Sequence, residues 1–230
     1  MNNEIKILFE DNHLIVAVKP PNVPTQEDSS KDSDFLSQIK EYIKEKYQKP
    51  GNVFLGLLHR LDRPVGGVMV FAKTSKAAGR LSEIIRTRNF TKSYIAVVHG
   101  TLSRKQGELH NFLVKDEKAN TSKVVLSTHQ GAKEAKLEYQ VMAMKESFSL
   151  VKIKLITGRH HQIRVQFAEF GHPIVGDQRY GKNTDSGIQI ALFAEFISFT
   201  HPVLNTEISF SALPADIFPW NLFRESLQRQ

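Results

Sequence analysis

The amino-acid sequence predicts an α+β fold with a mixed or antiparallel sheet. Apolar and polar residues alternate over several short segments, which is the period of a β-strand. Most of these segments follow one another directly, and only a few segments with helical spacing lie between them. A strictly alternating α/β fold would place a helix after nearly every strand, so this order of segments favours α+β.

The first third of the chain predicts a hairpin, two helices and a buried strand. Residues 5–9 and 14–18 are apolar runs separated by a short polar segment, as in a β-hairpin. Asp34 is expected to cap a helix with an apolar face, and Ser75 to cap a second helix. Residues 67–73, which lie between these helices, predict a buried strand.

The rest of the chain is dominated by predicted strands. Residues 160–171 have helical spacing. Strands are expected over the ranges 93–100, 123–127, 135–144, 148–156, 191–199 and 206–212. Because neither an internal repeat nor a clear linker is visible, we expect a single domain over residues 1–230.

The composition excludes several classes of protein. Hydrophobic residues make up 40% of the chain and charged residues 24%, as in ordinary globular proteins. The absence of cysteine excludes disulfides, cysteine-based zinc sites and thiol catalysis. No uncharged apolar run approaches the roughly 18 residues of a transmembrane helix, and the first residues lack the features of a signal peptide. We therefore expect a cytoplasmic protein.

The charge balance favours a polyanionic partner. Lysine and arginine outnumber aspartate and glutamate by 31 to 24, and the formal net charge is +7. Nucleic acid is the commonest partner of such a protein. The alternative is a mildly basic protein without any specific partner. Charge alone does not decide between these two interpretations, so a site has to support the first.

Several familiar catalytic motifs are missing from the sequence. The chain contains neither a Gly-x-x-x-x-Gly-Lys-Ser/Thr loop nor a Gly-x-Gly-x-x-Gly loop, so nucleotide-driven and dinucleotide chemistry have no support. Its histidines and acidic residues do not have convincing metal-ligand spacing. A Gly-x-Ser-x-Gly nucleophile elbow is also missing. We therefore do not expect a metal enzyme, a nucleotide-driven enzyme or a serine hydrolase.

The segment of residues 156–181 concentrates three arginines, three histidines and four glycines around a short predicted helix. A solvated basic helix is the alternative interpretation for any single residue of this segment. Apolar neighbours surround Arg164, so its guanidinium is expected close to the protein body. A buried arginine requires a carboxylate. Asp62, which also has apolar neighbours, is a plausible counterpart, although spacing alone does not show that they meet.

Three long blocks carry a resemblance to a known family. "HRLDRPVGGVMVFAKT", "KSYIAVVHG" and "TGRHHQIRVQFAEFGHPIVGDQRYG" together resemble the RluA family of pseudouridine synthases, with the motifs in the family's order. The resemblance extends from about Asn12 to Ala212. It implies a long, mostly antiparallel sheet flanked by helices, with a catalytic cleft across its middle. It also implies isomerisation of uridine to pseudouridine in RNA, without metal or organic cofactor.

Residue by residue, the resemblance implies three catalytic side chains. Asp62 would be the catalytic aspartate, Arg164 its ion-pair partner and Tyr94 the aromatic residue that stacks on the target base. An ionised carboxylate suits this reaction as a nucleophile or as the base that removes a sugar proton. A paired arginine favours that charged form. Without the resemblance, Tyr94 would be interpreted as a core residue of its strand.

Four further residues are expected to bind the substrate, of which Arg60 and Ile163 are implied by the resemblance. Arg60 would take the place of the flipped-out base, and Ile163 would line the uracil pocket. Arg159 would contact phosphate groups, and His161 would also belong to the substrate-binding surface. The implied partner is ribosomal or transfer RNA, and the protein is expected to be a monomer that binds neither a membrane nor a metal.

The sequence departs from the family pattern in places. The family commonly has Thr-Ser-Gly shortly after the catalytic aspartate, where this chain has Val65, Gly66 and Gly67. Family members often carry histidine at the positions of Gln166 and Phe193. Many relatives also begin with a small helical RNA-binding module. Only about a dozen residues precede the first motif here, so the chain resembles the short form of the family.

Two other functions compete with a synthase. The first is an RNA-binding or RNA-chaperone protein that keeps the fold but has no catalysis. The set of Asp62, Tyr94 and Arg164 speaks against it, because a pure binder does not need a reactive carboxylate in a basic cleft. The second is a glycosidase-like hydrolase, which would need two carboxylates flanking the bond. Only Asp62 is placed convincingly, so we rank this function last.

Overall fold

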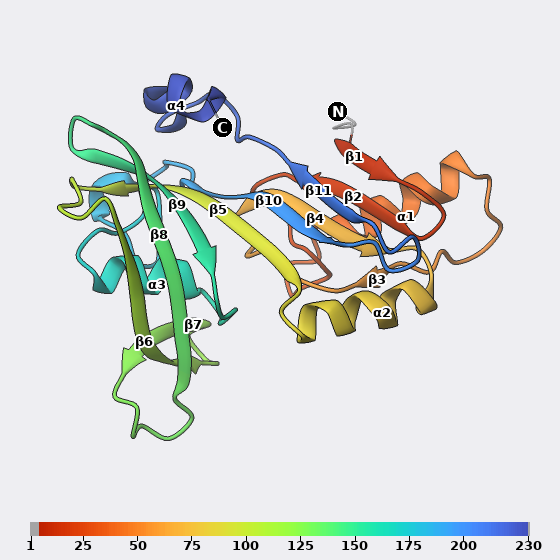
Figure 1. The fold of residues 1–230 in the computed structure, drawn as a ribbon, viewed down its shortest axis with the longest axis horizontal. Helices are drawn as coiled ribbons and strands as arrows, with labels where there is room; N and C mark the ends of the chain where they lie inside the picture. The colour runs from red at the N-terminus through yellow and green to blue at the C-terminus, as the bar shows by residue number, and fades with distance from the viewer. Residues whose placement is uncertain (1–4, 230) are drawn as a thin grey trace. The chain divides into compact units, whose positions relative to one another are not determined.

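The structure is a computed structural model, and it describes residues 5–229 (Figure 1). These residues form two compact units. The first comprises the chain up to Lys92 together with Ala194–Leu213, and the second comprises Ser93–Phe193 together with the chain from Pro214 onward. Strands come in adjacent runs with a few helices between them, which confirms the predicted α+β class. The single domain stays a prediction.

The strands of the first unit form one run of hydrogen-bonded neighbours. Their bounds are β1 (Ile7–Glu10), β2 (Leu14–Lys19), β3 (Gly56–Leu57), β4 (Gly66–Ala72), β10 (Leu192–Thr200, which enters this unit at Ala194) and β11 (Glu207–Ser211). The order is β1, β2, β4, β10, with β3 paired to β4 and β11 paired to β10. The pairs β1–β2, β2–β4, β3–β4 and β10–β11 are antiparallel.

The predicted hairpin at the start of the chain is confirmed by β1 and β2. Asp11 closes the turn between them, because its Oδ1 accepts hydrogen bonds from the N–H of His13 at 2.7 Å and of Leu14 at 2.6 Å. An aspartate that binds the backbone two and three residues ahead stabilises a turn locally. Strand β1 begins at Ile7 instead of Ile5.

Helix α1 (Phe35–Lys46) follows the cap that the sequence predicts. The Asp34 carboxylate accepts a hydrogen bond from the N–H of Ser37 at 3.0 Å, which satisfies a donor that has no partner inside the helix. The helix contacts β4 through Phe35, whose ring centroid lies 5.9 Å from that of Phe71. Figure 1 shows α1 beside the strands of the first unit.

Helix α2 (Ser75–Arg86) begins one residue earlier than predicted. The cap is Thr74, whose hydroxyl oxygen accepts from the N–H of Ala77 at 3.2 Å, and Ser75 is the first helical residue. The prediction of Ser75 as the cap was therefore wrong. Threonine and serine are both good caps, so two adjacent hydroxyl residues leave the first turn ambiguous. Ala77 and Leu81 are the buried residues of the helix.

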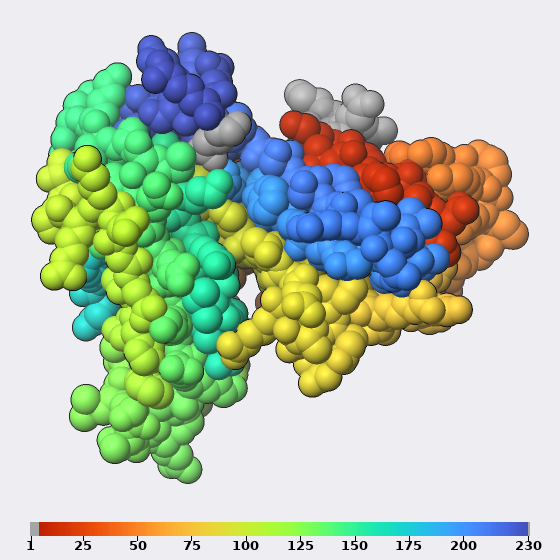
Figure 2. Space-filling view, viewed as in Figure 1, coloured from red at the N-terminus to blue at the C-terminus, as the bar shows by residue number. Residues whose placement is uncertain are grey.

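Strands β2 and β4 supply the core of the first unit. Every residue of β4 is buried, as predicted for this segment, and in β2 only Val18 is half-buried. The outer strands are joined by aromatic contact, since the ring centroids of Phe9 in β1 and Phe210 in β11 lie 5.3 Å apart. Figure 2 shows the C-terminal strands, in blue, lying against the N-terminal strands, in red.

Strand β4 passes very close to β10 at Gly67. The residue has φ +141°, and a Cβ atom there would lie 2.4 Å from the carbonyl oxygen of Ala194. Real side chains do not tolerate such a contact with backbone. One of the two glycines in the motif after Asp62 is therefore required by the packing of the sheet.

His59 is a buried residue that serves β4 as a hydrogen-bond acceptor. Its Nε2 accepts from the N–H of Val70 at 3.1 Å, and its ring lies 5.6 Å from that of Phe90. Burial lowers the pKa of His59 to about 3, and the nearby charge of Lys92 acts in the same direction. The imidazole is therefore neutral at pH 7 and carries its proton on Nδ1.

The strands of the second unit form an antiparallel run. Their bounds are β5 (Phe90–His99, which enters this unit at Ser93), β6 (Gln106–Asp116), β7 (Thr121–Val125), β8 (Lys133–Lys145) and β9 (Phe148–Leu155). The order is β5, β9, β8, β6, β7, and every one of these pairings is antiparallel. The predicted strands 93–100, 123–127, 135–144 and 148–156 are confirmed with small shifts at their ends.

Strand β6 was not predicted from the sequence. Its buried residues Leu109 and Leu113 lie four positions apart on one face, but the alternation of apolar and polar residues is interrupted between them. The position between them on the same face is Asn111, whose side-chain oxygen accepts from Gln166 Nε2 at 2.8 Å. A satisfied polar side chain thus interrupts the apolar pattern. The same Gln166 nitrogen also lies 3.2 Å from the carbonyl oxygen of Ala135 in β8.

The predicted helix of residues 160–171 is confirmed as α3 (Gln162–Glu169). His161, which precedes it, has φ +52°, and this left-handed conformation sets the first residue of the helix. The C-terminal elements were not predicted. They are the 3₁₀ turn η2 (Trp220–Phe223) and α4 (Arg224–Gln228), and a further 3₁₀ turn, η1 (Asn183–Asp185), follows α3. Within residues 5–229, no helix is long and apolar enough to cross a membrane.

We predict that His59 makes the protein less stable in mild acid. The unfolded state binds a proton near the ordinary pKa of 6.5, whereas the folded state does so only near 3. Stability is therefore lost as the pH falls below about 6.5, with a slope of up to about 1.4 kcal/mol per pH unit. Urea unfolding between about pH 6.5 and 5 measures this slope.

The variant His59→Gln keeps an acceptor and removes the titrating group, so it should flatten that dependence. The exposed His129 offers a matched control, because His129→Gln should leave the slope unchanged. Equal slopes in the wild type and His59→Gln would show the idea to be wrong.

Candidate active site

A buried ion pair lies inside the segment that the sequence marks as functional. Arg164 of α3 donates from Nε to Asp177 Oδ2 at 2.8 Å and from Nη2 to Asp177 Oδ1 at 2.7 Å. The two residues are only 3% and 1% exposed. Two parallel hydrogen bonds fix the plane of the guanidinium, which a lysine ammonium could not reproduce.

The Asp177 carboxylate is held in its charged form. Burial would raise its pKa, but the hydrogen bonds and charge of Arg164 lower it, and the N–H groups of Arg179 and Tyr180 act in the same direction. The net effect is a pKa below the usual value of an aspartate. Those N–H groups donate to Oδ1 at 2.9 and 3.2 Å. Asp177 therefore orders its own loop as well as the arginine.

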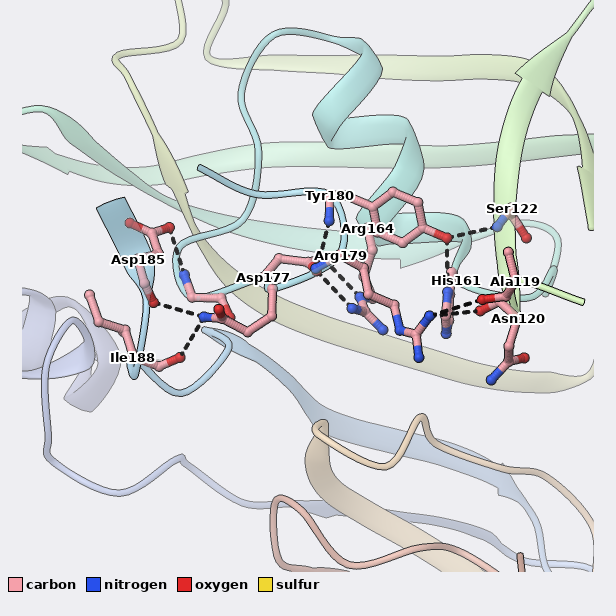
Figure 3. Close-up of polar contacts among 12 residues, drawn as sticks. Ala119, Asn120, Ser122, His161, Arg164, Asp177, Arg179, Tyr180, Asp185 and Ile188 are labelled. Atoms are coloured by element: carbon pink, nitrogen blue, oxygen red, sulfur yellow. Dashed lines mark hydrogen bonds and ion pairs between the residues drawn. The ribbon is translucent and has the colours of Figure 1, made fainter. Parts of the chain in front are cut away.

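Tyr180 connects this loop to the start of α3 and to β7 (Figure 3). Its hydroxyl oxygen accepts from the N–H of Ser122 at 2.7 Å and lies 2.9 Å from Nδ1 of His161. Its ring also lies beside the ion pair, since the guanidinium carbon of Arg164 is 5.4 Å from the ring centroid. The aromatic face thus adds a favourable contact to the buried cation.

Arg179 joins the same loop to the turn between β6 and β7. Its Nη1 donates to the carbonyl oxygens of Ala119 at 3.1 Å and Asn120 at 3.4 Å, as Figure 3 shows. The turn carbonyls would otherwise face solvent. The hairpin and the loop that orients Arg164 are therefore fastened together at two places, by Arg179 and by Tyr180.

In the first unit, Asp62 is half-buried at the start of a turn. The N–H of Val65 donates to the Asp62 carbonyl oxygen at 2.9 Å and closes this turn directly before β4. The next carbonyl, that of Arg63, accepts from Nζ of Lys19 at 3.1 Å. Lys19 is fully buried, and burial lowers its pKa to about 7, while the charge of Asp62 opposes this shift. A buried lysine thus lies beside the predicted catalytic carboxylate.

The two arginines next to Asp62 differ in their surroundings. Arg60 is exposed. Arg63 is held by an acidic segment, because its guanidinium donates to Ser30 Oγ at 2.9 Å and pairs with Asp32. Arg63 is exposed as well, but this acidic segment engages its guanidinium, whereas Arg60 is the arginine that the family resemblance marks as substrate-binding.

The other predicted site residues lie in the second unit. Tyr94 is 7% exposed in β5, where it pairs with Ile153 of β9. Ile163 is buried in the first turn of α3. Arg159 is exposed, and its Nε donates to the carbonyl oxygen of Glu134 at 2.8 Å. His161 is 8% exposed and its ring stacks on a neighbouring histidine ring at 3.7 Å.

The predicted site residues are thus divided between the two units. Asp62 and Arg60 belong to the first unit, and the others belong to the second. The ion pair between Asp62 and Arg164 stays a prediction. The sequence analysis missed Asp177, although it stands in the same motif block, 13 residues after Arg164. The signal was available, since a buried arginine can use any nearby carboxylate.

Over the part of the chain that the structure describes, no group of three or more histidine, cysteine, aspartate or glutamate side chains is arranged to hold a metal ion. The contacts around Arg164 and Asp62 consist of ion pairs and hydrogen bonds. Their chemistry is that of a charged carboxylate, fixed cations and aromatic surface.

Comparison with known proteins identifies the family. Residues 13–169, more than half of the chain, match the family described as RNA pseudouridylate synthase. The chain belongs to this family. The match includes Asp62, Tyr94 and Arg164, and it confirms the resemblance drawn from the sequence motifs. The synthase is an isomerase that acts on RNA, and the alternative of an inactive RNA-binding protein gains no support.

Curated relatives cover most of the synthase. It is 34% identical over 218 residues to the uncharacterised RNA pseudouridine synthase YhcT of Bacillus subtilis. The match covers 93% of this chain and 70% of the relative. It is also 34% identical over 220 residues to the ribosomal large subunit pseudouridine synthase C of Buchnera aphidicola, and this match covers 92% of this chain and 68% of the relative. The synthase D of Yersinia pestis is 31% identical over 229 residues, covering 93% and 68%.

A solved structure confirms the fold. The human RNA pseudouridylate synthase domain containing 4 superposes on the synthase with a TM-score of 0.78 at 24% sequence identity. The match covers 97% of this chain and 92% of that chain. The predicted pseudouridine synthase fold is therefore confirmed.

We predict that Asp177→Asn destabilises the synthase by about 3 kcal/mol or more. The substitution removes the Asp177 charge from the buried guanidinium of Arg164, and breaking a buried ion pair from one side has a cost of this size. The midpoint of urea unfolding, with an unchanged slope, measures the loss.

The exposed pair of Glu83 and Arg86 in α2 provides the matched control. Glu83→Gln also removes one carboxylate charge, but surface pairs contribute at most about 1 kcal/mol. Equal losses in the free energy of unfolding for the two substitutions would show that the pair between Arg164 and Asp177 stabilises the fold no more than a surface pair.

Proposed function

We propose that the synthase converts uridine to pseudouridine in ribosomal or transfer RNA, with Asp62 as its catalytic carboxylate. The observation that carries the proposal is the half-buried Asp62 in a closed turn, next to a buried cation and inside the matched family region. Ribosomal RNA is the first candidate, because two of the relatives are named as synthases of the large ribosomal subunit.

The reaction rearranges bonds within one nucleotide. The bond between sugar C1′ and uracil N1 breaks, the uracil turns, and a bond forms between C1′ and C5. The proton on C5 leaves and N1 gains one, so substrate and product have the same composition. Asp62 would act as the nucleophile or as the base that removes a sugar proton, and both roles need the charged carboxylate.

Two cations would support the charge of Asp62. The first is Lys19, whose buried ammonium interacts with the charge of Asp62. The second is Arg164, as the family resemblance implies. A guanidinium fixed by Asp177 presents further N–H donors in a defined plane, which suits recognition of a second carboxylate.

The target base has to leave its stack before it can react. Unstacking costs a few kcal/mol, and stacking on Tyr94 would return roughly 1–3 kcal/mol of that cost. Arg60 would take the position of the flipped base, and its exposed side chain is compatible with this role. Ile163 would line the uracil pocket. Arg159 and His161 would bind the RNA beside it.

Loss of Asp62 should abolish the reaction. We expect Asp62→Asn to lower tritium release from RNA labelled at uracil C5 by about a thousandfold or more, as for removal of other catalytic nucleophiles or bases. Labelled ribosomal and transfer RNA, prepared from cells lacking the synthase and assayed separately, would show which class is modified.

The exposed Asp216, which pairs with Arg224, gives a control of the same chemistry. Asp216→Asn should release tritium at the wild-type rate. Equal rates from wild type and Asp62→Asn would refute the role of Asp62. A wild-type protein without release on either RNA class would refute the proposed substrates.

A further inference from the structure

The backbone around Asp62 is held by a side chain from a distant segment. The hydroxyl of Thr25 donates to the carbonyl oxygen of Leu61 at 2.8 Å, and the N–H of Leu61 donates back to the hydroxyl oxygen at 3.2 Å. Thr25 is 5% exposed and Leu61 is 7% exposed. One hydroxyl thus pairs both backbone polar groups of the residue that precedes Asp62.

Thr25 is itself anchored by the start of α1. The N–H of Leu36 donates to the carbonyl oxygen of Thr25 at 3.1 Å, and the N–H of Phe35 donates to that of Pro24 at 2.8 Å. First-turn N–H groups have no partner within a helix, so they are available to hold another segment. The hydroxyl therefore projects from a fixed backbone and not from a mobile loop.

Lys19 holds the other side of Asp62. Its Nζ donates to the carbonyl oxygens of Pro20 at 2.9 Å, Val23 at 2.7 Å and Arg63 at 3.1 Å. Three acceptors match the three donors of an ammonium group. Burial lowers the pKa of Lys19 to about 7, while the charge of Asp62 opposes this shift. The geometry of three carbonyls favours the charged form, which links segment 20–25 to the turn.

We propose that Thr25 is a positioning residue for Asp62. By fixing the peptide groups on both sides of Leu61, its hydroxyl sets the direction in which the next residue leaves the backbone, while Lys19 fixes the residue after it. The carboxylate of Asp62 is then presented in one orientation before substrate binds. This inference rests on the proposed catalytic role of Asp62.

The variant Thr25→Val separates the hydrogen bonds of the hydroxyl from the volume of the side chain. Valine has nearly the shape of threonine, so Thr25→Val keeps the packing but leaves the buried N–H and carbonyl of Leu61 without their partner. Unpaired buried groups seek other partners, and the local backbone shifts. A displacement of about 1 Å at a reacting group can lower a rate about a hundredfold.

The test compares Thr25→Val with Thr25→Ser, which retains the hydroxyl. Tritium release from labelled RNA gives kcat and KM at a temperature where circular dichroism shows each protein to be folded. We expect Thr25→Val to lower kcat by about tenfold or more with KM changed less than about twofold. Thr25→Ser should keep kcat near the wild-type value, because the serine hydroxyl can form the same two hydrogen bonds.

Hydrogen exchange supplies a readout that does not depend on activity. In Thr25→Val, exchange should accelerate in the peptide containing Leu61 and Asp62, while peptides from the second unit keep the wild-type rate. A purely structural role would instead lower the unfolding temperature and leave kcat of the folded protein unchanged.

Three results would overturn the proposal. They are a kcat within twofold of wild type in Thr25→Val, an equal loss in Thr25→Ser, and unchanged exchange around Leu61. A wild type that releases no tritium contradicts the proposed function, and with it a catalytic purpose of the contact. The exchange rates then still decide whether Thr25 holds the turn, so the two failures are distinguishable.

Discussion

The bidentate ion pair between Arg164 and Asp177 is the constraint on which the site of the second unit depends. An arginine in a protein keeps its proton, so its burial requires a charged partner with good geometry. Asp177 meets that requirement and also binds two N–H groups of its own loop. One carboxylate, that of Asp177, therefore fixes both the orientation of Arg164 and the path of the loop.

The first unit meets a similar requirement with a different cation. Lys19 has no bidentate carboxylate, and three carbonyl oxygens surround its ammonium group instead. An arrangement of this kind links backbone segments that side-chain packing alone would leave independent. In both units, a buried basic side chain fixes a loop that carries or adjoins a candidate site residue.

Much of the fold follows from the sequence because its strands have clear apolar patterns, such as the continuous buried run of β4 and the alternation in β9. Strand β6 was not predicted because the polar Asn111 lies between its buried leucines, where it accepts a hydrogen bond from Gln166. For the site, the family motifs pointed to Asp62 and Arg164. Which carboxylate pairs with Arg164 depends on how the chain folds around it. Asp177 lies only 13 residues from Arg164 and was within reach of sequence reasoning, whereas the role of Thr25 exists only once two segments 36 residues apart meet.

The attachment of the β6–β7 hairpin to the loop after α3 has a consequence for motion. The hairpin turn provides acceptors for Arg179, and its second strand provides a donor for Tyr180. The same loop carries the partner of Arg164. Opening of the hairpin and disorder of the arginine are therefore one cooperative event and not two. A substitution that loosens the turn would raise the population of molecules whose guanidinium is misaligned, without touching the arginine itself.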